Sequence, residues 1–246
     1  MKAMIFAAGK GTRLRPITDT VPKAMVVVGG KPLLEWLLLK MAAFGIRDVV
    51  VNVHHLSDQV SDFISRKPVQ ELNIQISDET DLLLDTGGGL KKAAPMLQGD
   101  EPVLIHNVDI LSNLDFRKFE NDYLKAAVPA MLAVKDRQTA RKLEFSNEGL
   151  LYGWINESTG EHIVVNDFSG QVSRFAFSGI SIVSPEFPLM MRESGVFGFI
   201  PACLDLAKDN EIRKYDYTHE WLDVGKPEVL QNAEQFVHTY YKAYTK

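Results

Sequence analysis

An apolar run that leads directly into a glycine-containing basic loop most constrains how this chain can fold. Residues 3–8 are all apolar, and Gly9, Gly11, Arg13 and Lys23 follow closely. Glycine lets a backbone approach a ligand closely, and successive backbone N–H groups can form a concavity that binds anions. A guanidinium grips phosphate oxygens in a fork, and an ammonium adds a point charge. The segment therefore predicts a buried strand followed by a phosphate-binding loop.

The loop differs from the two common phosphate-binding motifs. A dinucleotide-binding fingerprint has a further glycine three residues after Gly11, where this chain has Leu14. A P-loop has Gly-Lys-Ser/Thr after a four-residue gap, and no such sequence follows Gly9. The loop therefore belongs to neither of these two classes.

Composition excludes several other classes of protein. The 246 residues suit one large α/β domain or two small ones. A net charge of −5 without a basic run argues against a nucleic-acid partner, and no apolar stretch is long enough to span a membrane. Cys203 is the only cysteine, so no intrachain disulfide can form. We therefore expect a cytoplasmic protein with neither a nucleic-acid nor a membrane partner.

The first half of the chain alternates between strand and helix patterns. Such alternation indicates a mainly parallel sheet with helices on both faces. Ligands of these sheets bind at the carboxyl ends of the strands, where the glycine loop and Asp109 fall. We expect strands at 1–7, 48–53, 72–76 and 102–106, and helices at 32–44, 57–66 and 86–97.

The second half of the chain has a different pattern. Between two expected strands at 128–134 and 175–183, the sequence is polar and interrupted by glycines, which is typical of hairpins. Expected helices follow at 186–193, 197–208 and 227–241. No sharp linker and no internal repeat divide the chain, and the sequence gives no indication of an oligomeric state.

Residues 6–23 resemble the signature of the sugar-nucleotide pyrophosphorylases, a family of nucleotidyltransferases. The family consensus reads roughly Leu-Ala-Ala-Gly-x-Gly-Thr-Arg-Leu-x-Pro-x-Thr, followed by Pro-Lys, and Phe6 is the only departure. The resemblance implies an α/β, Rossmann-like (GT-A-like) fold with a mainly parallel mixed sheet flanked by helices. We expect a single catalytic domain over residues 1–246, with a nucleotide-binding part at 1–127 and a sugar-binding part at 128–246. We expect no hexapeptide-repeat domain, which some relatives carry.

Two aspartates match the metal-binding positions of this family. Asp109 ends a buried strand, although Val108 stands where the family often has glycine. Asp223 lies in Trp-Leu-Asp-Val-Gly, which resembles the family's second metal-binding segment. Mg²⁺ binds few carboxylates and completes its shell with waters and substrate phosphates. The resemblance therefore implies a Mg²⁺ ion held by Asp109 and Asp223.

Two further segments resemble one subgroup of the family. The sequence Asp-Thr-Gly-Gly-Gly around Thr86 resembles the base-recognition loop of N-acetylmuramate-1-phosphate uridylyltransferases, and Phe-Ser-Gly-Ile at 177–180 resembles their sugar-contacting segment. Residues 140–145 depart from the glycine-rich turn that many members have there. Glu157 is only a candidate for the family's sugar-binding glutamate, so the choice of sugar stays open.

The resemblance assigns roles residue by residue. Arg13 and Lys23 are expected to be catalytic, and Ser178 and Gly179 are expected to contact the sugar. The expected nucleotide-binding residues are Ala7, Ala8, Gly9, Gly11, Thr12, Arg13, Lys23, Thr86, Gly88 and Asn107.

The implied reaction joins a nucleoside triphosphate to a sugar 1-phosphate and releases pyrophosphate. UTP with N-acetylmuramate 1-phosphate, a cell-wall precursor, is the leading pair. Guanylyl transfer to mannose 1-phosphate, thymidylyl transfer to glucose 1-phosphate and cytidylyl transfer to a phosphoalcohol are alternatives. A glycosyltransferase usually has Asp-x-Asp at the strand end, which Val108-Asp109-Ile110 does not match. An inactive regulatory relative would be expected to lose Arg13, Lys23 or a metal aspartate, and all of them are present.

Overall fold

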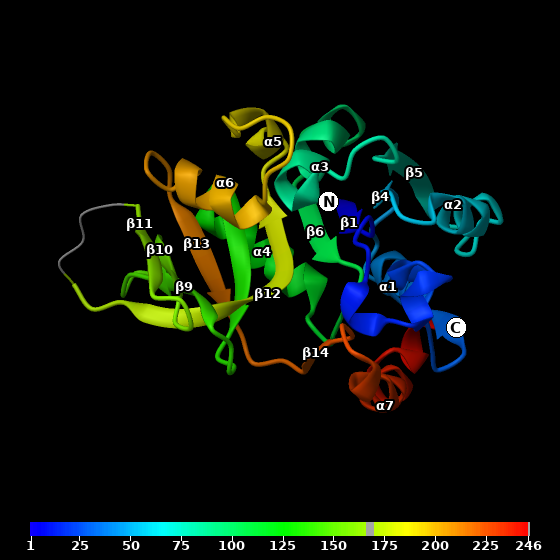
Figure 1. The fold of residues 1–246 in the computed structure, drawn as a ribbon. Coiled ribbons are helices and arrows are strands. Elements are labelled where there is room, and N and C mark those ends of the chain that lie inside the picture. Colours follow the sequence, from blue (N-terminus) through cyan, green and yellow to red (C-terminus); the bar gives the residue numbers. More distant parts are fainter. Residues whose placement is uncertain (166–169, 246) are drawn as a thin grey trace.

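Among the described residues, a mixed sheet of ten strands forms the centre of the fold (Figure 1). The computed structural model describes residues 1–165 and 170–245. Four neighbouring strands are parallel, in the order β6, β1, β4 and β5, and β12 continues the sheet antiparallel to β6. Their bounds are β1 Lys2–Phe6, β4 Asp48–Val53, β5 Asn73–Asp78, β6 Val103–Asn107 and β12 Ser173–Val183. The expected α/β fold class is thus observed.

Alternate side chains of β1 enter two hydrophobic clusters on opposite faces of the sheet. Ala3 and Ile5 belong to a cluster that includes residues of α1, α2 and α4. Met4, which points the other way, belongs to a cluster with residues of α3, α5 and α6. These helices are α1 Leu33–Ala43, α2 Ser57–Ser65, α3 Asp85–Ala93, α4 Phe116–Ala126, α5 Phe187–Met190 and α6 Phe199–Leu206.

The second half of the chain extends the sheet away from the parallel part (Figure 1). β9, β10 and β11 form an antiparallel meander beside β12, and β13 pairs in parallel with β8. The bounds are β8 Ala130–Lys135, β9 Arg141–Phe145, β10 Leu151–Asn156, β11 Glu161–Val164 and β13 Ile212–Asp216.

Two small pairings complete the fold. β7 Ile110–Ser112 pairs antiparallel with β14 Trp221–Asp223, and β2 Val27–Val28 pairs with β3 Lys31–Pro32. The last long helix, α7 Leu230–Tyr240, contributes Ala233 and Val237 to a third cluster with Leu14 and Trp36. The end of the chain is therefore packed against the segment that follows the N-terminal loop. Among the described residues, no helix has the length and apolar character needed to cross a bilayer.

Candidate active site

The loop after β1 is held in place by one buried side chain. The Oδ1 atom of Asn52, in β4, accepts hydrogen bonds from the amides of Ala7 and Ala8 at 2.7 and 3.3 Å. The Nδ2 atom of Asn52 donates to Glu79 Oε1 at 2.7 Å, and Glu79 is fully buried. The amides of Ala7 and Ala8 are therefore used inside the protein, where they set the direction in which the loop leaves the sheet.

The next amides of the loop face no protein acceptor. Those of residues 9–12 have no hydrogen-bond partner within the part of the chain that the structure describes. Gly11 has a left-handed φ of 63° and its carbonyl accepts the Thr18 hydroxyl at 2.7 Å. A Cβ atom on Gly11 would lie only 2.8 Å from Thr18 Cγ2, so glycine is required here. A fixed turn thus presents unpaired N–H groups, the arrangement that binds phosphate oxygens.

The structure brings Asp109 and Asp223 together. Asp109 follows β6, and Asp223 ends β14, where it is the register partner of Ile110 in β7. The amide of Val224 donates to the Asp109 carbonyl oxygen at 2.8 Å. The short β7–β14 ladder therefore sets two aspartates from distant parts of the sequence beside each other.

Each aspartate has a cationic neighbour from the N-terminal segment. Lys23 Nζ forms an ion pair with Asp109 Oδ2, and the two side chains are only 12% and 14% exposed. Arg13 Nη1 lies 3.5 Å from Asp223 Oδ2. A Cβ atom on Gly225 would stand 2.6 Å from both Arg13 Nη2 and Asp223 Oδ1. Two ion pairs thus meet at the end of the loop with the unpaired amides.

The two carboxylates supply the charge and the oxygen ligands that a divalent cation prefers. Burial, followed by the negative charge of Asp109, raises the pKa of Asp223, and Arg13 and Lys23 only partly oppose this. Asp223 Oδ1 is buried without a hydrogen-bond partner in the described part of the chain. No cluster of three or more His, Cys, Asp or Glu side chains occurs among those residues. A two-carboxylate set fits an ion such as Mg²⁺, which takes few protein ligands and leaves positions for phosphates.

A cavity of about 280 Å³ lies beside the loop on the side of α3. Thr86 lines this cavity, and its hydroxyl oxygen accepts the amide of Phe199 at 2.9 Å. Gly88 instead donates its amide to the Phe197 carbonyl at 3.0 Å, which packs α3 against the segment before α6. Asn107 ends β6 opposite Phe6, at the base of the loop. The full lining consists of Phe6, Ala8, Gly9, Asn52, Leu83, Asp85, Thr86 and Val196.

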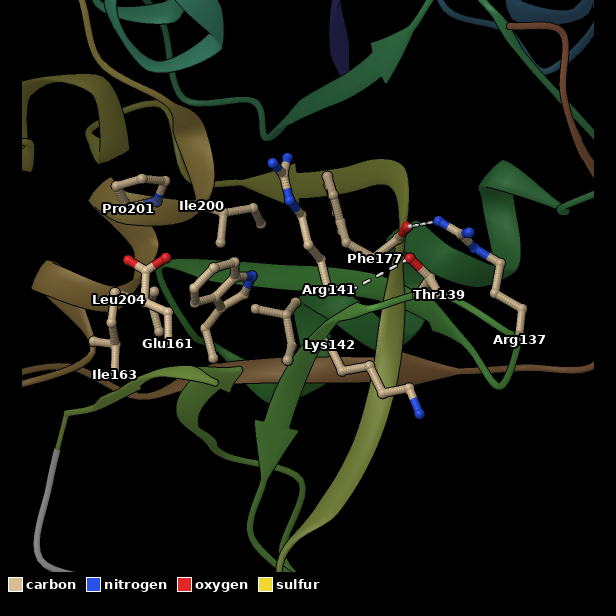
Figure 2. Close-up of a pocket in the computed structure, with 12 residues that line it drawn as sticks. Arg137, Thr139, Arg141, Lys142, Glu161, Ile163, Phe177, Ile200, Pro201 and Leu204 are labelled. Carbon is tan, nitrogen blue, oxygen red and sulfur yellow. Dashed lines mark hydrogen bonds between the residues drawn. The ribbon is translucent and has the colours of Figure 1, made fainter. Parts of the chain in front are cut away.

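A second cavity, of about 440 Å³, lies between β9, β12 and α6 (Figure 2). Phe177 lines it, while Ser178 and Gly179 follow in a stretch where the register between β12 and β8 shifts. The Ser178 carbonyl accepts Trp221 Nε1 at 2.8 Å. Ser178 therefore positions Trp221, two residues before Asp223. Glu157 is paired with Lys142 at 3.1 Å and with Arg174 at 3.7 Å.

Comparison with known proteins places this arrangement in a family. The family described as nucleotidyl transferase matches residues 2–240. The chain belongs to the nucleotidyl transferase family. It is 30% identical over 239 residues to an N-acetylmuramate alpha-1-phosphate uridylyltransferase of Neisseria meningitidis, a match that covers 95% of this chain and 97% of the relative. A protein of the same name from Caulobacter vibrioides is 31% identical over 244 residues, which cover 94% and 95% of the two chains.

Solved structures with lower sequence identity share the fold. HddC from Yersinia pseudotuberculosis superposes with a TM-score of 0.75 at 22% identity, over 95% of this chain and 98% of that one. The enzyme thus groups with the sugar-1-phosphate nucleotidyltransferases, as the resemblance of residues 6–23 predicts. The expected family and fold class are confirmed.

Sequence reasoning did not single out four residues that the structure places at the two cavities or the loop. Asn52 breaks a valine-rich strand at its carboxyl end, which was an available signal. Glu79, Arg137 and Arg141 gave no such signal, because their surroundings are polar in sequence. Only the packed fold shows that Glu79 is buried under the loop and that both arginines line the larger cavity.

Proposed function

We propose that this enzyme transfers a uridylyl group from UTP to N-acetylmuramate 1-phosphate and releases pyrophosphate. The observation that carries the reaction type is the meeting of the Lys23–Asp109 and Arg13–Asp223 pairs beside the unpaired amides of residues 9–12. The choice of base and sugar is supported by the two uridylyltransferase relatives, which match almost the whole chain.

The two cavities support the proposal that different parts of the chain bind the nucleotide and the sugar. The smaller cavity is lined by residues of the first half together with Val196, and the larger cavity is lined only by residues between Arg137 and Leu204. We propose that residues 1–127 bind the nucleotide and that residues 128–246 bind the sugar. Asp223 is an exception to this division. It belongs to the second part of the chain, but β14 pairs with β7 of the nucleotide-binding part.

The reaction requires no side chain as nucleophile. A phosphate monoester has a second pKa of about 6 and is largely a dianion at neutral pH. One of its oxygens attacks the α-phosphorus in line as the bond from that phosphorus to the bridging oxygen breaks. The electron pair leaves with pyrophosphate, and no proton has to be transferred. The protein must therefore align two polyanions and stabilise charge on the leaving group.

The side chains divide this task by position. Arg13 and the amides of residues 9–12 would hold the β- and γ-phosphates and favour departure of pyrophosphate. Lys23 would neutralise the α-phosphate or the sugar phosphate. Asp109 and Asp223 would hold a divalent cation, which we propose to be Mg²⁺. When bound, such an ion would supply positive charge that stabilises the negative charge of the reacting phosphates.

The smaller cavity is proposed as the place of the base. Asp85 and Thr86 of the glycine-rich segment line it, and Gly88 supports it indirectly through the contact with Phe197. Ala7, Ala8 and Asn107 would act through the loop, since they lie at its base. Ser178 and Gly179 would act on the sugar side through Phe177 and Trp221.

Guanylyl transfer to mannose 1-phosphate is the main competing proposal. A mannose-1-phosphate guanyltransferase of Gibberella zeae is 25% identical over 245 residues, which cover 92% of this chain and 61% of that relative. Steady-state kinetics with each common triphosphate would decide between the bases. We expect UTP to have the highest kcat/KM. A value for GTP more than about tenfold above that for UTP, equivalent to about 1.4 kcal/mol, would overturn the uridylyl proposal.

A further inference from the structure

The larger cavity has an apolar wall and two arginines. Its volume of about 440 Å³ is within the usual range for small-molecule sites. Trp154, Phe177 and Leu204 supply apolar surface, and Arg137 and Arg141 reach it from the start of β9 and the segment before it. Figure 2 shows the Arg141 side chain extending across the cavity.

Arg141 differs from Lys142 and Arg174 in having no acidic partner among the described residues. Lys142 is paired with Glu157, and Arg174 is paired with buried Glu144 at 2.9 Å. Among the described residues, no carboxylate lies within ion-pair distance of the Arg141 guanidinium. Glu161 also lines the cavity, but Figure 2 shows its carboxylate at the opposite end, beside Pro201 and Leu204. The cavity therefore contains a guanidinium that is free to bind an anion.

Arg137 marks the end of the cavity that faces the paired aspartates. Its Nη2 donates to the Phe177 carbonyl at 3.4 Å, and its guanidinium lies 4.6 Å from the centre of the Trp221 ring. Trp221 and Asp223 belong to the same short strand. Burial lowers the pKa of Arg137, and the charge of Asp223 opposes that shift. A sugar 1-phosphate in this cavity would thus have its phosphate near Arg137 and the far side of its ring near Arg141.

We propose that the enzyme selects sugar 1-phosphates that carry a carboxylate, and that Arg141 binds this second anion. The proposal rests on the proposed function and narrows its substrate class. A planar guanidinium matches a carboxylate with two parallel hydrogen bonds. Arg141 is exposed, so its charge stays hydrated beside a neutral sugar, which gains no ionic contact from it. Arg141 belongs to residues 140–145, where the chain departs from the glycine-rich turn of many relatives.

Matched substrates separate recognition of the carboxylate from catalysis. N-acetylmuramate 1-phosphate and N-acetylglucosamine 1-phosphate differ by a lactyl ether that carries a carboxylate. Glucuronate 1-phosphate and glucose 1-phosphate differ by a carboxylate at C6. The kcat/KM of pyrophosphate release would be measured for all four with saturating UTP, for the wild type, Arg141→Ala and Arg141→Lys. Arg66→Ala is the control, because Arg66 at the end of α2 is exposed and, among the described residues, in no ion pair.

We expect the wild type to prefer the acidic member of at least one pair. Arg141→Ala should lower kcat/KM for that acidic substrate by about tenfold or more, mainly by raising KM, because a charge-assisted contact is lost. The same substitution should change kcat/KM for the neutral partner less than about twofold. Arg141→Lys should give values between those of the wild type and Arg141→Ala, and Arg66→Ala should behave like the wild type. If the wild type prefers only glucuronate 1-phosphate over its neutral partner, the Arg141 contact would be supported. Glucuronate 1-phosphate would then replace N-acetylmuramate 1-phosphate as the proposed substrate.

Two results would overturn the inference. One is equal turnover of acidic and neutral sugars by the wild type, and the other is an equal loss on both members of a pair in Arg141→Ala. Failure of the proposed function has a different signature, because the wild type would then release no pyrophosphate with UTP and any of the four sugars.

Discussion

Asp223 faces Ile110 across the β7–β14 ladder, which brings its carboxylate against that of Asp109. The amide of Val224 reinforces this position by donating to the Asp109 carbonyl. The site is therefore assembled only when the C-terminal part of the chain docks onto the strand that follows β6. Burial, followed by repulsion from Asp109, raises the pKa of Asp223, so ionising this carboxyl group is a cost of assembling the site.

Removing either carboxylate should reduce turnover strongly. Asp109→Asn and Asp223→Asn are each expected to lower kcat about a hundredfold or more, because a divalent cation would lose an anionic ligand. Pyrophosphate release at saturating substrates and cation measures the effect. Full activity in excess chelator, or wild-type turnover in both variants, would refute the assignment.

The same two substitutions should differ in their effect on stability without metal. In chelator at pH 7, Asp223→Asn should unfold at the same temperature as the wild type or higher. A raised carboxyl pKa means that ionisation costs stability as pH rises through that pKa, and asparagine does not ionise. Asp109→Asn should lower the free energy of unfolding by roughly 1–3 kcal/mol, since Lys23 then lacks its partner. Calorimetric melting distinguishes the two, and a lower melting temperature for Asp223→Asn would contradict the argument.

Asn52 should matter for both the loop and the fold. Asn52→Ala leaves the amide of Ala7 and the buried Oε1 atom of Glu79 without their partner, which should cost about 1–3 kcal/mol of unfolding free energy. Because the loop is then less well positioned, the KM for UTP should rise. Urea unfolding and initial-rate kinetics measure the two effects. Asn73→Ala is a matched control, because the exposed side chain of Asn73 hydrogen-bonds only to Asp48 among the described residues. Equal effects in both variants would disprove the special role of Asn52.

His106 should make stability depend on pH below neutrality. Burial, followed by the charge of Lys40, lowers its pKa to about 3. In the unfolded chain, the histidine takes up a proton at about pH 6.5. The contribution of neutral His106 to the free energy of unfolding is therefore full above that pH and is lost as pH falls towards 3. The loss is at most about 1.4 kcal/mol per pH unit.

The His106 contribution can be isolated by substitution. The difference in unfolding free energy between pH 7 and pH 4 should be smaller in His106→Gln than in the wild type, as measured by urea unfolding at both pH values. Exposed His238 provides the control His238→Gln, which should behave as the wild type does. If the difference in unfolding free energy between pH 7 and pH 4 is unchanged in His106→Gln, this histidine does not cause the loss of stability in acid.

Much of the first half of the fold could be predicted, because its signals are local. The strand at Asp48–Val53 agrees with the expected bounds, and α1 differs from them by one residue at each end. Helix α4 was missed although its signals are also local. Asp115 accepts the amides of Arg117 and Lys118 as an N-cap, and Phe116, Phe119 and Tyr123 share one buried face. The charged residues between these aromatics obscured the helical period.

The sequence by itself determined the family, the fold class and the chemical groups that a phosphate-binding loop requires. These follow from a contiguous segment, residues 6–23, in which spacing along the chain carries the information. Only the tertiary structure decided which groups meet. Asp223 reaches Asp109 through the β7–β14 ladder, Asn52 reaches the loop from the neighbouring strand, and Arg141 extends across a cavity closed by α6. The physical reason is that these contacts join residues far apart in sequence, so packing and strand register, and no local pattern, set their geometry.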